Sequence, residues 1–92
     1  MTIFEKEKKR TIKSILKQIV YDRRLSPEDF YILFRGTNEQ IFKARVSDIS
    51  LEQFWFVLNE KTIPYHRIVE IGNSITGEII LKRTYHRFKK RL

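Results

Sequence analysis

The spacing of apolar residues changes once along this chain, at Phe30, and this change constrains the fold more than any other feature. Over residues 12–20 the apolar side chains recur every three or four positions, which is typical of an amphipathic helix. From Phe30 onward they alternate with polar residues or form short runs, as they do in strands. We therefore predict a helix over about residues 4–21, with Thr2 and Glu5 as a weak capping box, followed by a sheet.

Five segments have the composition of strands, and short connections join them: residues 30–35, 41–46, 54–58, 66–71 and 78–83. The sequence Ser-Pro-Glu-Asp at 26–29 predicts a short helical turn before the first strand. Pro64 has no N–H to donate, so it belongs before a strand or on a sheet edge. Because short connections favour antiparallel neighbours, the predicted fold class is α+β: an N-terminal amphipathic helix followed by a bent, mainly antiparallel five-stranded sheet.

The basic residues are concentrated at the two ends of the chain. The net charge is +8, to which residues 6–24 and 82–92 contribute +6 each, whereas residues 25–81 carry −3. This segregation is typical of a protein that binds a polyanion, although basic ends can also be merely solvated. The 92 residues fit a single domain, 1–92, in which 84–92 form a basic tail that is either ordered or disordered.

Two sets of cations are predicted to track a nucleic-acid backbone. Four side chains fall in one stripe of the predicted helix, away from its apolar side: Lys6, Arg10, Lys13 and Lys17. Four more lie in the basic tail: Arg87, Lys89, Lys90 and Arg91. Lysines on the wet side of a surface helix are also ordinary structural features, so that alternative stays open.

The composition excludes several classes of function. The absence of Cys excludes disulfides, thiolate metal sites and Cys nucleophiles, and only two His are present, His66 and His86. No apolar run approaches the roughly twenty residues of a membrane-spanning helix, and no signal segment is visible, so we expect a cytoplasmic protein without membrane contact. No phosphate-binding loop, zinc-protease motif or nucleophile elbow occurs. We expect no metal, no cofactor and no catalysis; the alternative is a metal-independent RNA phosphodiesterase that uses His66.

The hexapeptide Ile-Pro-Tyr-His-Arg-Ile at 63–68 contains the densest group of functional side chains. Tyr65 can stack on a base, Arg67 can hold a phosphate by two hydrogen bonds, and His66 can donate to an anion. If this segment is a strand, Tyr65 and Arg67 point to one face and His66 to the other. In the alternative interpretation, Tyr65 packs in the core and Arg67 pairs with an acid such as Glu70.

The hexapeptide resembles the signature of a small, mainly archaeal family, the RNA cyclic group end recognition domain. Further similarities occur in the same order over residues 11–83: Tyr21-Asp22, Leu25 to Phe30, Arg35-Gly36 and Gly77 to Arg83. The family tends to have Trp where this chain has Tyr21 and Leu81, and the tail from Tyr85 lies outside the shared pattern. The resemblance implies binding of RNA ends that bear a 2′,3′-cyclic or related terminal phosphate, in the company of RNA-processing proteins. The residues it points to are Tyr65, His66 and Arg67, with Arg35, Lys82 and Arg83 as neighbours.

Three functions fit these observations. The first is a non-catalytic RNA-binding domain in which Tyr65 or Tyr31 stacks a base and His66 and Arg67 hold a terminal phosphate. The second is a protein-interaction or homo-oligomeric assembly module, because Phe54, Trp55 and Phe56 cannot all face one core from a strand. The third is a general polyanion-binding protein that takes DNA as well as RNA.

Overall fold

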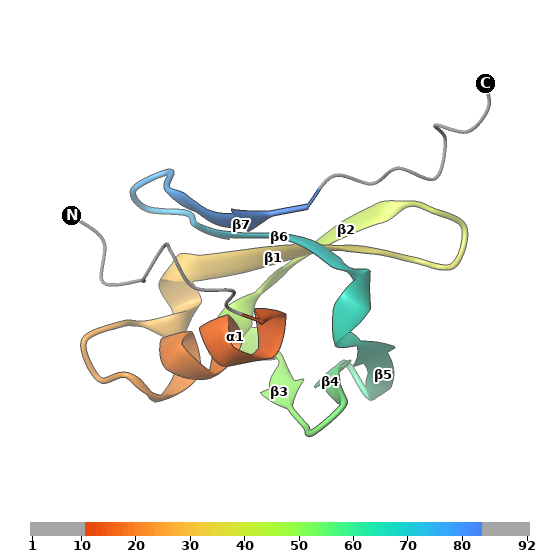
Figure 1. Ribbon diagram of the computed structural model, residues 1–92, viewed down its shortest axis with the longest axis horizontal. Coiled ribbons are helices and arrows are strands. Elements are labelled where there is room, and N and C mark those ends of the chain that lie inside the picture. Colours follow the sequence, from red (N-terminus) through yellow and green to blue (C-terminus); the bar gives the residue numbers. More distant parts are fainter. Residues whose placement is uncertain (1–10, 84–92) are drawn as a thin grey trace.

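The structure is a computed structural model that describes residues 11–83 (Figure 1). The one α-helix in these residues, α1 (Ile12–Tyr21), is capped by Thr11, whose side-chain oxygen accepts a hydrogen bond from the Ser14 backbone N–H at 3.0 Å. Thr11 itself has an extended backbone, so the helix begins at Ile12, and the predicted start near residue 4 is wrong. The predicted Thr2–Glu5 capping box lies outside the described residues.

The strands form two antiparallel sheets. The four-stranded sheet has the order β2 (Ile41–Arg45), β1 (Phe30–Arg35), β6 (Ile68–Asn73) and β7 (Ile79–Lys82). The three-stranded sheet has the order β3 (Ser50–Leu51), β4 (Trp55–Leu58) and β5 (Lys61–Pro64). The predicted fold class, a helix followed by antiparallel β-structure, is confirmed. The prediction of one five-stranded sheet is wrong, because the single-turn helix η2 (Val46–Asp48) leads the chain from the first sheet into the second.

Three turns connect these elements. The helical turn predicted from Ser-Pro-Glu-Asp is confirmed as η1 (Pro27–Asp29). The turn predicted at residues 59–62 contains only Asn59 and Glu60, whose φ angles of 52° and 69° give the left-handed backbone of a two-residue hairpin turn. The residues that follow pair with β4 as the edge strand β5, and Pro64 ends that strand, as an edge position allows. The strand predicted from residue 66 begins instead at Ile68, after the single-turn helix η3 (Tyr65–Arg67).

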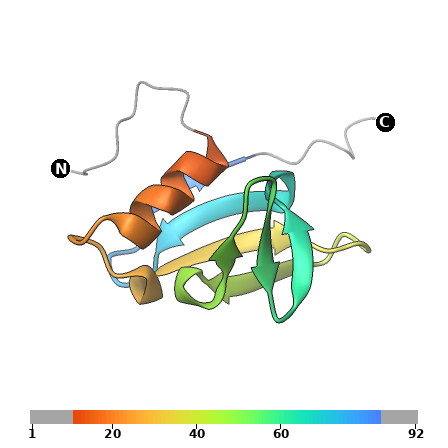
Figure 2. The ribbon, with the colours of Figure 1, turned by 90° about the horizontal axis from the view of Figure 1, so that it is seen from below.

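The core lies on one side of the four-stranded sheet. Helix α1 and the three-stranded sheet both pack against this side (Figures 1 and 2). Alternate residues of β1, starting at Phe30 and ending at Phe34, point into the core and are buried, while the intervening residues face outward and are half-buried. Phe56 of β4 is fully buried and meets Phe34 edge-on, with ring centroids 5.8 Å apart. Within residues 11–83, no element covers the outer side of the four-stranded sheet.

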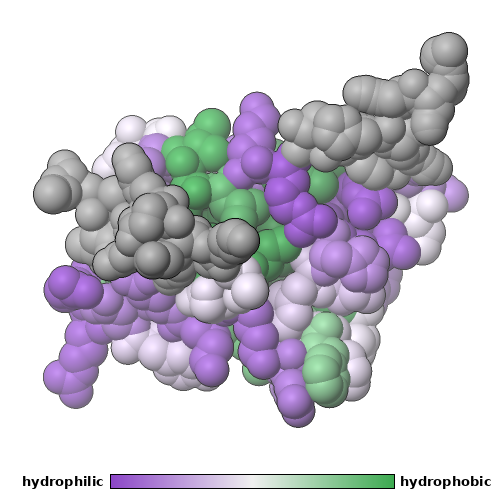
Figure 3. Space-filling view, viewed as in Figure 1, coloured by the Kyte–Doolittle hydropathy of each residue, from purple (hydrophilic) through white to green (hydrophobic). Residues whose placement is uncertain are grey.

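The surface in the view of Figure 1 is mostly hydrophilic, with hydrophobic side chains exposed over β7 (Figure 3). Ile79 in this strand is half-exposed. In the part of the chain that the structure describes, no helix has the length and apolar character needed to cross a membrane.

Candidate functional site

The hexapeptide at 63–68 connects the two sheets rather than forming a strand. Ile63 and Pro64 end β5, Tyr65 to Arg67 form η3, and Ile68 begins β6 with its side chain fully buried. Successive residues of a 3₁₀ turn are about 120° apart around its axis. The side chains of η3 therefore point in three directions, and the prediction that Tyr65 and Arg67 share one strand face is wrong.

Tyr65 packs against the core. Its ring lies 6.0 Å from the Phe56 ring between centroids, and its hydroxyl donates to the Glu52 carbonyl at 2.6 Å. Burial of this side chain raises the pKa of the Tyr65 hydroxyl. The contacts join η3 to the segment between β3 and β4, so Tyr65 holds the turn in place, in agreement with the core-packing interpretation of the sequence.

Arg67 connects η3 to the end of the β1–β2 hairpin. Its Nη1 atom donates to the Gly36 carbonyl at 3.2 Å and lies 3.5 Å from the Arg35 carbonyl oxygen. The absence of a side chain at Gly36 lets the Phe42 ring lie close to the backbone of this residue, since a Cβ atom on Gly36 would be 2.6 Å from that ring. The alternative pairing of Arg67 with Glu70 is not what the structure shows: Arg67 donates to backbone carbonyls of the hairpin, and Glu70 accepts a hydrogen bond from the Tyr31 hydroxyl.

A cleft of about 560 Å³ lies beside Arg67, between the β1–β2 hairpin and the β4–β5 hairpin. This volume is in the range of small-molecule sites. Phe42 lines the cleft, is 46% exposed, and packs against Phe34 with the two rings tilted by 31° and their centroids 5.7 Å apart. Arg35, Lys61 and Arg67 also line it, and none of the described residues around it is Asp, Glu or His.

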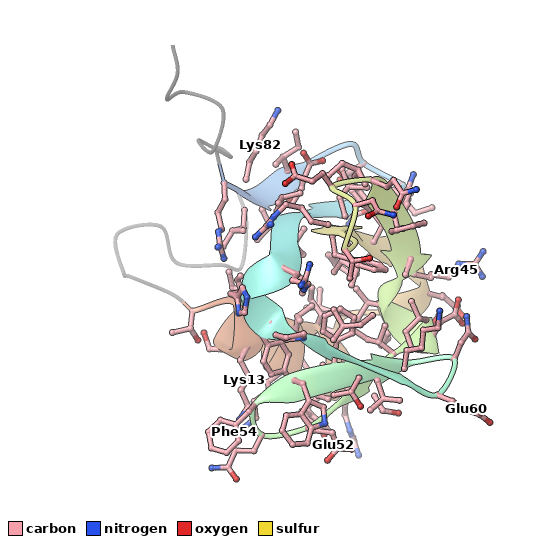
Figure 4. All side chains as sticks on the ribbon, turned by 90° about the vertical axis from the view of Figure 1, so that its right-hand side faces the viewer. Lys13, Arg45, Glu52, Phe54, Glu60 and Lys82 are labelled. Atoms are coloured by element: carbon pink, nitrogen blue, oxygen red, sulfur yellow. The ribbon has the colours of Figure 1, made fainter. Side chains whose placement is uncertain are left out.

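Figure 4 faces the side of the molecule on which these elements meet, with Glu60 marking the tip of the β4–β5 hairpin. The cleft therefore combines an accessible aromatic ring with three cations in the absence of a lining carboxylate. Such a surface suits a ligand that has both a flat apolar part and a negative charge.

The other predicted site residues lie outside the cleft. His66 is exposed, and its backbone carbonyl accepts a hydrogen bond from Arg83 Nη2 at 3.2 Å. Lys82 lies opposite Glu70 across the β6–β7 pair, on the outer side of the four-stranded sheet. The structure thus brings Arg35 and Arg67 together at the cleft and His66 and Arg83 together beside η3.

The predicted backbone-tracking residues are only partly described. Lys13 donates from Nζ to the Gln53 carbonyl at 2.9 Å, which ties α1 to the β3–β4 connection. Lys17 is exposed on α1. The remaining members lie outside the described residues, as does His86: Lys6, Arg10, Arg87, Lys89, Lys90 and Arg91.

Sequence reasoning missed Phe42 and Lys61 as components of the site. The sequence pattern predicts a strand position without a site role for Phe42 and a turn position for Lys61. The available signal was Asn59-Glu60, since Asn favours the left-handed conformation of a two-residue hairpin turn. A two-residue turn at 59–60 makes residues 61–64 a strand and places Lys61 directly after the turn.

No group of three or more His, Asp and Glu residues within the described range 11–83 could hold a metal ion. The cleft offers an aromatic ring, cations, and the hydroxyl and amide groups of Thr37, Gln40, Asn59 and Thr62. A general acid–base pair would need a second titratable group within reach of His66.

The fold and the site define a small α+β domain with a basic, aromatic cleft. Residues 10–83 match the family described as the MJ1316 RNA cyclic group end recognition domain. The chain belongs to this family, which confirms the resemblance seen in the hexapeptide.

Similar proteins occur in archaea. A UPF0248 protein of Methanococcus vannielii is 34% identical over 74 residues, which are 78% of this chain and 90% of that protein. The UPF0248 protein MJ1316 of Methanocaldococcus jannaschii is 36% identical over 74 residues, with 78% of this chain and 92% of that protein covered. A UPF0248 protein of Pyrococcus abyssi is 39% identical over 66 residues, with 70% and 80% covered. No solved structure matches the chain.

Proposed function

We propose that this chain is a non-catalytic RNA-binding domain that holds the end of an RNA strand bearing a terminal phosphate. The observation that carries the proposal is the cleft, in which a half-exposed Phe42 ring lies near Arg35, Lys61 and Arg67 without a lining carboxylate. The family name, RNA cyclic group end recognition, supports RNA ends as the ligand class.

Each part of the cleft has a chemical task in this proposal. The terminal base stacks on the Phe42 ring, because every base has a π-face and stacking on aromatics tolerates any sequence. The phosphate lies against Lys61 and the Arg67 guanidinium. A guanidinium has five N–H donors, and the Gly36 and Arg35 carbonyls engage one of its nitrogens. Arg67 thus holds the end of the β1–β2 hairpin through one nitrogen, and its other N–H groups are proposed to contact the phosphate.

A 2′,3′-cyclic phosphate carries one negative charge and fixes both ribose oxygens in a ring. A 3′-phosphate carries up to two charges and leaves the 2′-hydroxyl free. The two ends therefore differ in charge and in hydrogen-bond donors, which gives a site made of an aromatic ring and a few cations the means to distinguish them.

The lining of the cleft supports binding without cleavage as the proposed function. Cleavage needs a general base and a general acid at the reacting phosphate, and His66 lies outside the lining. The competing function is a phosphodiesterase that uses His66. Incubation of cyclic-ended RNA with the protein, followed by electrophoretic analysis of the ends, distinguishes the two, because ring opening abolished by His66→Ala would refute the non-catalytic proposal.

The test of binding is fluorescence anisotropy with one short RNA made with a 2′,3′-cyclic phosphate, a 3′-phosphate or a 3′-hydroxyl, and with the matching DNA. Lys61→Ala should weaken binding to the two phosphate ends by about tenfold, the loss of one charge-assisted contact. It should change binding to the hydroxyl end little. The exposed Arg23→Ala removes the same charge away from the cleft and serves as the control. An equal loss for all three ends would refute end recognition.

One observation favours a second candidate, an assembly module. Phe54 and Trp55 are 66% and 41% exposed, and their rings lie 6.3 Å apart beside β4, while Phe56 points into the core. Figure 4 shows Phe54 at the surface, near Glu52. Aromatic residues are enriched at protein–protein interfaces. Light scattering of the wild type and of Phe54→Ser tests this: a dimer dissociated by the substitution supports assembly, and a monomer at all concentrations refutes it.

A further inference from the structure

The outer side of the four-stranded sheet carries cationic, aromatic and aliphatic side chains. Residues paired across antiparallel strands point to the same face, so the register gives rows of neighbours. One row contains Arg45, Tyr31, Gly72 and Ile79, and the next contains Lys43, Leu33, Glu70 and Lys82. Arg35 and Ile41 pair at the end of the β1–β2 hairpin, beside the cleft.

The charge of this face is strongly positive. It has four cations, Arg35, Lys43, Arg45 and Lys82, and one acid, Glu70. Glu70 accepts a hydrogen bond from the Tyr31 hydroxyl within the face. The face as a whole is therefore complementary to an anionic partner.

Tyr31 gives the same face a flat aromatic surface. A Cβ atom on Gly72 would lie 2.6 Å or less from three atoms of the Tyr31 side chain, so this ring lies directly over the glycine. Lys43 Nζ is 4.8 Å from the ring centroid. Aromatic, aliphatic and cationic side chains together on an open sheet are the combination that single-stranded nucleic acids bind.

Figure 4 shows Lys82 and Arg45, on the two edge strands of this sheet, pointing away from the core in different directions. Lys43 and Arg45 lie two residues apart on β2, about 7 Å along one strand. Lys43 is opposite Leu33 and Arg45 is opposite Tyr31, so the two cations lead away from Arg35 toward the beginning of β1. Arg35 belongs to this face and also lines the cleft, so the two surfaces adjoin at this residue.

We propose that the outer side of the four-stranded sheet binds the nucleotides that precede the RNA end, with Lys43 and Arg45 contacting their phosphates. The inference rests on the proposed function, because it takes the cleft as the site of the terminal nucleotide. It differs from tracking along α1, since the helix lies on the opposite side of this sheet (Figures 1 and 2).

The test compares two charge-matched variants. Lys43→Ala/Arg45→Ala removes one Lys and one Arg from the outer face, and Lys17→Ala/Arg23→Ala removes the same two residue types from α1 and the segment after it. All four side chains are exposed, so both variants should fold. Dissociation constants are measured over a range of salt concentrations for a two-nucleotide and a ten-nucleotide RNA with the same phosphorylated end.

For the ten-nucleotide RNA, the slope of log K against log salt should fall by about 1.4 in Lys43→Ala/Arg45→Ala, since each phosphate contact on a single strand contributes about 0.7. The two-nucleotide RNA should bind this variant with little change, and discrimination between ends should remain. Equal slopes for both variants, or a loss confined to Lys17→Ala/Arg23→Ala, would overturn the inference.

The two proposals fail in different ways. If the wild type binds both RNA lengths equally and still discriminates between ends, the outer face has no role and the cleft stands. If the wild type does not distinguish phosphate from hydroxyl ends, the proposed function fails, whatever the slope for the longer RNA.

Discussion

The position of the Tyr31 ring over Gly72 can be tested by giving that glycine a side chain. A Cβ atom at residue 72 would lie 2.4 Å from the Tyr31 hydroxyl oxygen and 2.6 Å from two ring carbons. Contacts this short do not persist, so Gly72→Ala must displace the ring. The backbone of Gly72 lies outside the left-handed region, which only Gly77 occupies among the described glycines, so alanine fits the main chain.

The expected cost follows from the contacts of the ring. Displacement breaks the hydrogen bond from Tyr31 to Glu70, and a bond to a charged group contributes about 1.5–3 kcal/mol. The lower end of that range applies here, because the site is half-exposed and water can replace the partner. Replacing glycine also reduces the entropy of the unfolded chain, which stabilises by about 0.4–1 kcal/mol. The net destabilisation is about 1 kcal/mol, or roughly 4–8 °C in Tm for a domain of this size.

The energetic coupling between residues 31 and 72 is measured by urea denaturation of four proteins: the wild type, Gly72→Ala, Tyr31→Ala and the double variant. With Tyr31 already removed, the clash is absent and only the entropic effect remains. Gly72→Ala should then stabilise by about 0.5 kcal/mol, so its effect changes sign between the two backgrounds. The same free-energy change in both backgrounds would refute the placement of the ring.

Three further predictions concern the stability of the same fold. The hydrogen bond to Glu70, together with burial, raises the pKa of Tyr31 from 10.0 to about 12. Because the folded value exceeds the unfolded one, this stabilisation is complete below pH 10 and is lost as the pH rises to about 12. The difference in unfolding free energy between the wild type and Tyr31→Phe should therefore shrink over that interval, and a constant difference would contradict it. Glu60 has a φ of 69°, which costs a non-glycine residue about 1–2 kcal/mol, so Glu60→Gly should raise the stability by about 0.5 kcal/mol after the entropic loss. A lower Tm of this variant would show that the turn is not strained. Phe56→Ala removes a fully buried ring and should cost about 3–5 kcal/mol, whereas Phe54→Ala, at a side chain that is 66% exposed, should stay within about 0.5 kcal/mol by chemical denaturation. Similar losses for the two would contradict the assignment of β4.

The elements predicted well are those whose local pattern agrees with their packing. Helix α1 has an apolar stripe that is buried in the structure, and β1 alternates between buried and half-buried residues over its whole length. The stripe of α1 is visible in the sequence because the helix buries one side. Strand β1 is recognisable instead as a short run of apolar residues, 30–34, since its outward-facing side chains are also mostly apolar. The strand β5 was missed, since it has four residues, ends in Pro64 and is held by pairing with β4 alone.

The turn η3 could not be predicted because distant contacts hold it. Tyr65 donates to the carbonyl of Glu52, and Arg67 donates to the carbonyl of Gly36, thirty-one positions away. A local reading of the hexapeptide favours a strand, since Tyr and Ile have high β-propensity. The cleft has the same origin, because Phe42 and Lys61 come from two hairpins that meet only after folding.

The distribution of charge shows what a sequence average conceals. The segment 25–81 has five basic and eight acidic residues, so it reads as mildly acidic, and the basicity was assigned to the two ends. In the structure, all five of its cations lie at the cleft or on the outer side of the four-stranded sheet: Arg35, Lys43, Arg45, Lys61 and Arg67. Of its eight acids, Glu70 lies on that face, where it accepts a hydrogen bond from Tyr31. Strand alternation causes part of this separation, since Lys43 and Arg45 lie two positions apart on β2 and point away from the core on the same face as Arg35 of β1. A segment with a negative net charge therefore builds the surfaces to which an RNA end and its preceding nucleotides are proposed to bind.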